Sequence, residues 1–252
     1  MAHKTLISGT TYSVSGGREL IGGTGYGCKA GKALIGGTAF TVPFSKGIPL
    51  NTITPGAILY LNESGNPVPF YIAKHNYESG LNGAGRTLVV RKDCYDSRTF
   101  GRNNVYENSA MDTWLNGTYL TLLDEAVQTA IATTKFYHTT ILYSNFTLAT
   151  LQRAVFLLSV AEYGFSSGSV KVEGSKLPIA ETLRIAYHNG SAVAHWTRSR
   201  STGSSAVPNV DRTGNINASN YGTGNIYSRP VFTLPGDLVV IANADGTYTL
   251  AA

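Results

Sequence analysis

The sequence has few cysteines, and this shortage limits its covalent chemistry. Cys28 and Cys94 are the only two cysteines in 252 residues, they are far apart, and neither belongs to a C-x-x-C pair. This usage predicts neither a disulfide framework nor a zinc site. We therefore expect the chain to fold without a disulfide, a metal or another cofactor.

Charge is also scarce. Charged residues make up 14% of the chain, the formal net charge is only +5, and the basic residues are scattered along the sequence. Proteins that bind nucleic acid usually carry a basic stripe or arm. We therefore expect no nucleic-acid partner.

Long hydrophobic runs are missing as well. No segment approaches the roughly 20 apolar residues that a membrane-spanning helix needs, and the first nine residues contain no apolar run of the signal-peptide kind. The sequence thus predicts no membrane insertion, and it predicts synthesis and first folding in the cytoplasm.

Signatures of catalysis are lacking too. The sequence contains no G-x-S-x-G, no H-E-x-x-H, no P-loop and no G-x-G-x-x-G that opens a helix. The histidines are isolated, and the 15 acidic residues are too dispersed to name an acid/base pair. These absences predict a protein that is not an enzyme.

Glycine, tyrosine and small polar residues are what the chain does have. It contains 28 glycines and 15 tyrosines, and 42% of its residues are hydrophobic. That hydrophobic share suffices for one large core. The balance is typical of a β-rich domain whose surface and loops are made polar by Ser, Thr and Asn.

The N-terminal region is an internal repeat with a period of 14 residues. Three position classes recur in register, and they are Leu6, Leu20 and Leu34, then Thr10, Thr24 and Thr38, then Tyr12, Tyr26 and Phe40. Each repeat predicts two short strands joined by a glycine-containing turn. Because fourteen residues cannot bury a core, the repeats must stack on one another or on a partner. A docking arm for a larger assembly is favoured over a β-meander that only decorates this chain.

The middle of the chain predicts strands followed by helices. Strands are expected over 57–61, 68–75 and 86–92, with a turn at 63–66. Apolar residues at spacings of three and four predict helix over 108–131. Ser109 is the expected first cap, Asn116-Gly117 the expected break and Asp124 the second cap. Trp114 falls in the apolar stripe and is expected in the core.

Further along, the pattern is less decisive. Residues 154–158 predict a buried strand, with Ser159 and Glu162 capping a following turn, but a helix over 150–163 is a competing interpretation. A helix is expected over 178–187, a hairpin over 210–216 and a strand over 227–234. Residues 238–250 predict a terminal hairpin around Asp245-Gly246, which could be a second docking element.

A long polar stretch lies between residues 193 and 234. It begins at an aromatic and basic segment and continues through about thirty residues of Ser, Thr, Asn, Gly and Tyr, too polar to form a core of their own. Long ordered loops on a scaffold are common binding sites, and antigen-binding loops favour the same residue types. A surface hairpin pair without a ligand is the open alternative. The predicted binding residues are Trp196, Arg198, Arg200, Asn215, Asn217, Asn220, Tyr221, Asn225 and Tyr227.

Three of the residues in this stretch carry a qualification. Trp196 and Tyr227 each adjoin an expected strand, so they could instead pack beneath the loops. Arg229 precedes Pro230, and we expect it to clamp loop carbonyls rather than to contact a ligand.

Three blocks resemble an uncharacterised domain family common in phage and gut-bacterial proteins. They are 108–119 (NSAMDTWLNGTY), 155–162 (VFLLSVAE) and the motifs at 196–199, Gly214 and 229–232. Their layout is similar to C-type-lectin-like folds of the formylglycine-generating-enzyme and phage variable-protein kind. The repeat K-x-L-I-x-G-T also resembles N-terminal segments of tail-associated virion proteins from phages of Firmicutes. The calcium-dependent sugar motifs and the catalytic cysteine pair of such relatives are absent, so their chemistry does not carry over.

The resemblance implies an α+β chain in which a C-type-lectin-like domain follows a small β-repeat arm. We expect the arm at 1–47, the domain at 48–235 and a β-hairpin at 236–252. The implied function is that of a virion structural protein, tail- or baseplate-associated and oligomeric in the particle. It would dock to other virion proteins through the repeats and display a binding surface for a host protein or glycan. A purely architectural virion component is the alternative, and a glycan-cleaving enzyme the weakest one.

Overall fold

The computed structural model describes residues 47–252 except 103, 143–144, 167, 203, 219–221 and 252, and in the N-terminal region it describes the backbone of six strands. The chain divides into two compact units, Met1–Gly47 and Ile48–Ala252. Both units are described by themselves below.

The described strands of the N-terminal unit pair as three hairpins with one register. In each of them, an isoleucine pairs across the turn with a threonine three residues later, namely Ile7 with Thr10, Ile21 with Thr24 and Ile35 with Thr38. The 14-residue repeat of the sequence therefore corresponds to one hairpin per repeat. The hairpins are β1 (His3–Ile7) with β2 (Thr10–Val14), β3 (Arg18–Ile21) with β4 (Thr24–Gly27), and β5 (Ala30–Ile35) with β6 (Thr38–Pro43).

The second unit, hereafter the domain, is an α+β structure built on an eight-stranded mixed sheet. The strand order is β14-β21-β10-β9-β8-β23-β22-β7, and all neighbours are antiparallel except β23 and β8. The strands are β7 (Ile48–Pro49), β8 (Ile58–Glu63), β9 (Asn66–Lys74), β10 (Arg86–Arg91), β14 (Val155–Phe156), β21 (Val231–Pro235), β22 (Val239–Ala242) and β23 (Tyr248–Leu250).

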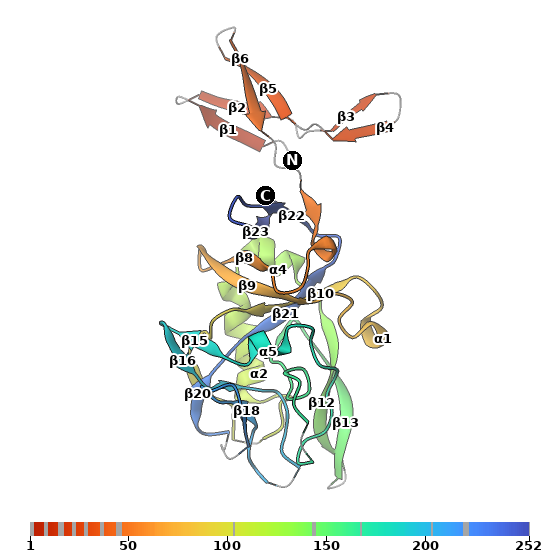
Figure 1. The fold of residues 1–252 in the computed structure, drawn as a ribbon, viewed down its shortest axis with the longest axis vertical. Helices are drawn as coiled ribbons and strands as arrows, with labels where there is room; N and C mark the ends of the chain where they lie inside the picture. The colour runs from red at the N-terminus through yellow and green to blue at the C-terminus, as the bar shows by residue number, and fades with distance from the viewer. Residues whose placement is uncertain are drawn as a thin grey trace. The chain divides into compact units, whose positions relative to one another are not determined.

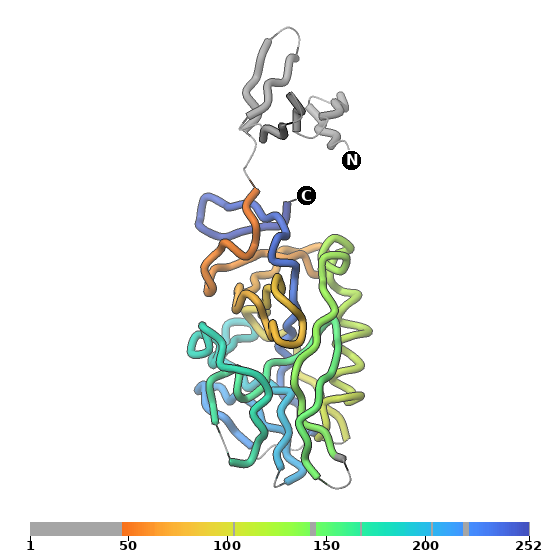
Figure 2. Tube along the Cα trace, turned by 90° about the vertical axis from the view of Figure 1, so that its right-hand side faces the viewer, coloured from red at the N-terminus to blue at the C-terminus, as the bar shows by residue number. Residues whose placement is uncertain are grey.

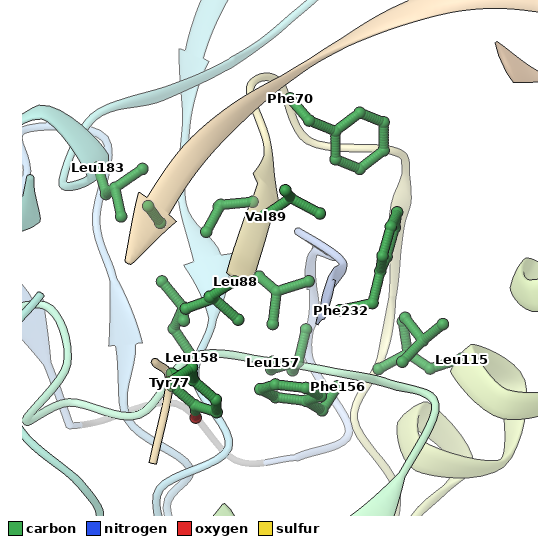
Figure 3. Close-up of a cluster of buried hydrophobic side chains, with 14 of the residues drawn as sticks. Phe70, Tyr77, Leu88, Val89, Leu115, Phe156, Leu157, Leu158, Leu183 and Phe232 are labelled. Atoms are coloured by element: carbon green, nitrogen blue, oxygen red, sulfur yellow. The ribbon is translucent and has the colours of Figure 1, made fainter. Parts of the chain in front are cut away.

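The centre of this sheet explains why apolar and polar residues do not alternate cleanly along its strands. In β10 the four residues from Thr87 to Val90 are all fully buried, because elements cover both faces of the strand. Phe70 and Phe232 lie on its two neighbours, with ring centroids 5.3 Å apart. Figure 3 shows them with Val89, beside the cluster of Phe156 and Leu157. This is the core of the domain.

The predicted helical segment is confirmed, but the break expected at Asn116-Gly117 is wrong, because these two residues lie in a π-helical turn, helix continues from Ala110 to Leu122, and the break falls at Leu123. The segment comprises α2 (Ala110–Trp114), a π-helical turn η2 (Leu115–Tyr119), α3 (Leu120–Leu122) and α4 (Glu125–Ala130). The Ser109 hydroxyl accepts from the amide of Asp112 as a helix cap. Asp124 occupies the cap position of α4, but its carboxylate accepts from the amide of Gly65 in the β8–β9 turn instead.

Trp114, which is expected in the core, packs against the hydrophobic core but stays partly exposed. It is half-buried, and the Arg98 guanidinium lies 3.4 Å from its ring centroid. Two tyrosine rings also pack on it, Tyr95 and Tyr119, with centroids 5.5 and 5.4 Å away. The apolar period places Trp114 on the core-facing side of the helix, and one arginine and two tyrosines also pack on its ring.

A long hairpin, β12 (Thr134–Leu142) with β13 (Asn145–Arg153), was not predicted. Because β13 continues to Arg153 and β14 follows at Val155, the competing helix over 150–163 is wrong and the expected buried strand is correct. The capping pair is also confirmed, since the Ser159 amide donates to Glu162 and the Glu162 amide to the Ser159 hydroxyl.

Short elements make up the rest of the domain. The predicted helix over 178–187 is reduced to α5 (Ala180–Leu183), because a strand begins at Ala186. A five-stranded sheet has the order β11-β20-β17-β18-β19. The remaining elements are β7's neighbour η1 (Leu50–Thr52), α1 (Ser79–Asn82), β11 (Ser97–Thr99), β15 (Ala186–His188), β16 (Ser191–Val193), β17 (His195–Trp196), β18 (Asn209–Val210), β19 (Ile216–Asn217) and β20 (Asn225–Tyr227).

The expected terminal hairpin forms, but it is part of the domain rather than an appendage. Strand β23 lies between β8 and β22, and β22 pairs with β7. Val240 is fully buried. The boundary expected at 235/236 therefore does not separate two structural units. Within the described part of the chain, no helix is both long and apolar enough to cross a membrane.

The domain has two distinct ends. Strands β7, β22 and β23 lie at one end, whereas the β12–β13 hairpin and the segments around β18 and β20 extend to the opposite end (Figures 1 and 2). The end formed by the polar stretch and the β12–β13 hairpin is called the loop end below.

Candidate functional site

The first predicted contact residue, Trp196, is fully buried. Its indole nitrogen donates to the carbonyl of Arg98 at 2.9 Å, and its ring lies 5.6 Å from that of Phe100. The expectation that Trp196 contacts a ligand is therefore wrong, and the alternative that it packs beneath the loops is correct. The buried ring of Trp196, in β17, therefore supports the base of the loops.

Arg198, also predicted as a contact, is buried as a clamp inside the domain. Its guanidinium donates to a Glu162 carboxylate oxygen at 2.6 Å, and both side chains are fully buried. It also donates to three carbonyls, those of Tyr137, Leu157 and Glu173. A charge this deep is tolerated only when it is paired and fully hydrogen-bonded. Arg198 thus joins the start of the polar stretch to the β12–β13 hairpin and to the loop before α5.

A second buried carboxylate, Glu173, completes this cluster. Its oxygens accept from the amide and hydroxyl of Thr139 at 2.7 and 2.5 Å and from the Ser199 hydroxyl at 2.8 Å. Burial raises the pKa of Glu173 to about 7, although nearby Arg198 lowers it. The Tyr77 hydroxyl donates to Glu162 at 2.5 Å, and burial raises the pKa of Tyr77 well above its usual value. The cluster is a polar core rather than an open site.

Arg229 is a clamp, as the sequence predicts. It is 1% exposed, and its guanidinium donates to the carbonyls of Arg91 and Lys92 at 2.9 and 2.8 Å and to that of Leu183. Its positive charge and burial lower the pKa of the neighbouring His195 well below the usual value, with burial the larger cause. His195 is thus held neutral inside the domain.

The exposed part of the polar stretch is smaller than predicted. Asn215 and Asn225 are exposed, Asn217 is half-buried, and Tyr227 is half-buried with its ring 4.8 Å from that of His188. Asp211 accepts from the amides of Thr213 and Asn215, which shapes the β18–β19 turn. Asn220 and Tyr221 lie outside the described residues.

Arg200 differs from the other predicted contacts. It is 8% exposed, and its guanidinium carbon lies 4.7 Å from the ring centroid of Phe146 in β13. Phe146 lines an open hollow of about 390 Å³ at the loop end, together with Asn145, Gly168, Val170, Lys171 and Thr202. Sequence reasoning missed this hollow because three segments distant in the chain form it, and no local pattern connects them.

A second hollow, of about 250 Å³, lies at the other end of the domain between β8, β23 and α4.

Cys94 is buried, and burial raises the pKa of its thiol to about 12. Among the described residues, no group of three or more His, Cys, Asp or Glu side chains is arranged to hold a metal ion.

Comparisons with known proteins identify a family. Residues 84–236, more than half of the chain, match a family described as a domain of unknown function (DUF6273), and the chain belongs to this family. A search of curated proteins and a search of solved structures each returned no match. The matched span includes β10, the broken helical segment and the whole polar stretch.

Proposed function

We propose that this chain is a non-enzymatic phage virion protein whose domain, a C-type-lectin-like scaffold, displays a binding surface at its loop end. The observation that supports this proposal is that some residues of the polar stretch are buried anchors whereas others are exposed. Trp196, Arg198 and Arg229 are buried and bond to carbonyls of other segments, whereas Asn215 and Asn225 are exposed. Anchored bases and exposed polar tips are typical of binding loops on a rigid scaffold.

The positions of the two ends of the domain support the same proposal. The chain enters the domain at β7, next to β22, and these strands lie at the end opposite the loop end (Figure 1). An attachment at the entering end would leave the loop end free for a ligand. In this proposal the N-terminal hairpins dock to other virion proteins, because two-stranded hairpins are marginal alone.

An architectural component without a host ligand is the competing function. The burial of Trp196 and Arg198 favours it, because two of the expected anchor residues are not available to a ligand. Electron microscopy separates the two. An antibody against the loop end, detected with immunogold, should label a tail tip if the surface recognises a host. It should not label the intact particle if neighbouring subunits cover the loop end.

A binding assay tests the proposal directly. The full chain, fluorescently labelled, is incubated with cell envelopes of Firmicutes, including the host of the encoding phage. We expect saturable binding that the double variant Asn215→Ala/Asn225→Ala weakens by at least threefold without a change in melting temperature. Both side chains are exposed, so their truncation removes contacts rather than core. Equal binding of both proteins, or none by the natural chain, contradicts a host-binding surface.

A further inference from the structure

The β12–β13 hairpin has one covered edge, which belongs to β12. The backbone of Lys135 bonds to the Asn82 side chain through both its amide and its carbonyl, at 2.8 and 2.9 Å. The Tyr137 carbonyl accepts from a buried arginine at 2.9 Å, and the Thr139 amide donates to a buried glutamate at 2.7 Å. Side chains of other segments thus satisfy the edge of β12 that faces away from β13.

The opposite edge of the hairpin, along β13, is open. In an antiparallel pair, the backbone groups of alternate residues point toward the partner strand and away from it. Because the three β12 residues just named point away from β13, the register assigns the outward positions of β13 to Phe146, Leu148, Thr150 and Gln152. Within the described part of the chain, β12 is the one strand that pairs with β13, and the outward amides and carbonyls of Phe146, Leu148 and Thr150 have no hydrogen-bond partner.

The sequence does not protect this edge. Natural edge strands are usually shortened, bulged, or blocked by charge or proline. Residues 145–152 (NFTLATLQ) contain no charged residue and no proline, and all nine residues of β13 pair with β12 without a register shift. The edge strands of the two larger sheets, β14, β7, β11 and β19, are only two or three residues long. Strand β13 is therefore a long and unprotected edge.

Apolar side chains lie beside the open edge and face solvent. Leu148 is 42% exposed, and Ile141 on β12 is 45% exposed. Ile141 pairs with Phe146, two residues from Leu148, so these three side chains share one face of the hairpin. In Figure 1, β13 lies at the outer border of the domain, beyond β12. The edge is thus accessible to another strand.

We propose that two copies of this chain associate through β13, edge to edge and antiparallel, so that the two hairpins join into one four-stranded sheet. With Ala149 opposite its counterpart in the second copy, Phe146 lies opposite Gln152. Leu148 then lies opposite Thr150, and the two Leu148 side chains become diagonal neighbours. Sheets of three or more strands are more stable than an isolated hairpin, so the association completes a sheet that each copy leaves unfinished.

The composition and spacing of β13 favour a second copy as the occupant. The outward positions are symmetric about Ala149, so in this register each of them meets another outward position, whereas a shifted register leaves some unpaired. Like charges that face each other across two strands are destabilising. Since residues 145–152 carry no charge, two identical strands meet without that repulsion. The inference is independent of the proposed function, because it concerns self-association and not a host ligand.

The test is sedimentation velocity of the full chain over a wide range of concentrations, and we expect a reversible dimer. Thr150→Lys places a charge on the open edge and should weaken dimerisation at least tenfold. Thr150→Pro removes one outward amide but no bond to β12 and should do the same. The control Thr129→Lys adds the same charge at an exposed position of α4 and should dimerise as the natural chain does. If the proline variant does not fold, the lysine variant and its control decide the matter.

Cysteine cross-linking tests the register. In a Cys28→Ser background, where the remaining Cys94 is buried, Ala149→Cys should form a disulfide-linked dimer on mild oxidation. Directly opposite residues of a non-hydrogen-bonded pair have Cα atoms about 4.5 Å apart, which a disulfide can span. Gln152→Cys, at an exposed position of the same strand, lies opposite Phe146 rather than its own counterpart and should not cross-link.

Three results would overturn the inference. The first is a natural chain that stays monomeric at every concentration. The second is a dimer that both folded Thr150 variants leave intact, which would locate self-association elsewhere in the chain. The third is cross-linking that does not distinguish Ala149→Cys from Gln152→Cys. Failure here is separate from failure of the proposed function, because the envelope-binding assay is read with the natural chain and the Asn215→Ala/Asn225→Ala variant.

Discussion

At the scale of single residues, the two tryptophans differ in burial, since Trp196 is fully buried and Trp114 only half-buried against the core. Trp196→Ala should lower the free energy of unfolding by about 3–5 kcal/mol, because it removes a fully buried ring and its bond to the Arg98 carbonyl. Trp114→Ala should cost less, since Trp114 is half-buried under an arginine. Urea unfolding of both variants measures the order, and a larger loss for Trp114→Ala would contradict the burial described here.

Glu173 predicts how stability depends on pH. Burial raises the pKa of its carboxyl in the folded protein from 4.5 to about 7. Between these pH values Glu173 is ionised in the unfolded chain but protonated in the folded chain, so its contribution to stability is fully present below pH 4.5 and is lost as the pH rises to about 7. The contribution of this group is on the order of 3 kcal/mol.

Glu173→Gln should flatten that slope, because glutamine cannot ionise but can still accept from Thr139. A residual slope in the same direction is expected from Glu78, whose pKa burial also raises. Urea unfolding at intervals from pH 4.5 to 7.5 makes the comparison. An unchanged slope in the variant would show that Glu173 is not the titrating group.

At the scale of elements, one asparagine ties the helical segment to the sheet. The Asn116 amide in the π-helical turn donates to the Val155 carbonyl at 2.9 Å and accepts from the amides of Ala154 and Val155, both at 3.1 Å. Asn116→Ala should destabilise the domain by about 2–4 kcal/mol, because it leaves several backbone groups unbonded. Thr129→Ala, an exposed helical position, is the control and should change stability by less than about 0.5 kcal/mol. Equal effects in thermal melting would refute this role.

The terminal hairpin makes a second prediction at this scale. Deletion of residues 238–252 removes β22 and β23, which leaves β7 unpaired and exposes the edge of β8. We expect a large fall in melting temperature and faster limited proteolysis near residue 50. A deleted chain that melts as the full chain does would show that the hairpin is an appendage after all.

At the scale of the whole molecule, the two units should be separable. Deletion of Met1–Ser45 removes the hairpins but keeps β7, which begins at Ile48, so the domain should unfold at an unchanged temperature. If the hairpins are the assembly anchor, the same truncated chain should fail to join the particle. Calorimetry measures the first result and particle purification the second. Normal incorporation would refute the anchor, and loss of folding would refute the separation.

The sequence determined the features that repeat or alternate locally. The 14-residue repeat predicts one hairpin per repeat, Ser109 predicts the cap of α2, and Ser159 with Glu162 predicts a capping pair. Arg229 was identified as a clamp from its place before Pro230. These features depend on neighbours in the chain, whose spacing the sequence states directly.

Only the tertiary structure decided which polar residues face solvent. Arg198 and Arg200 stand two residues apart in one polar stretch, yet Glu162 neutralises the first, and the second packs on Phe146 without a carboxylate partner among the described residues. The partners lie dozens of residues away in sequence. A charged side chain can be buried where segments distant in the sequence supply its acceptors. The composition of the stretch predicts binding loops, but long-range pairing determines which of its residues can bind.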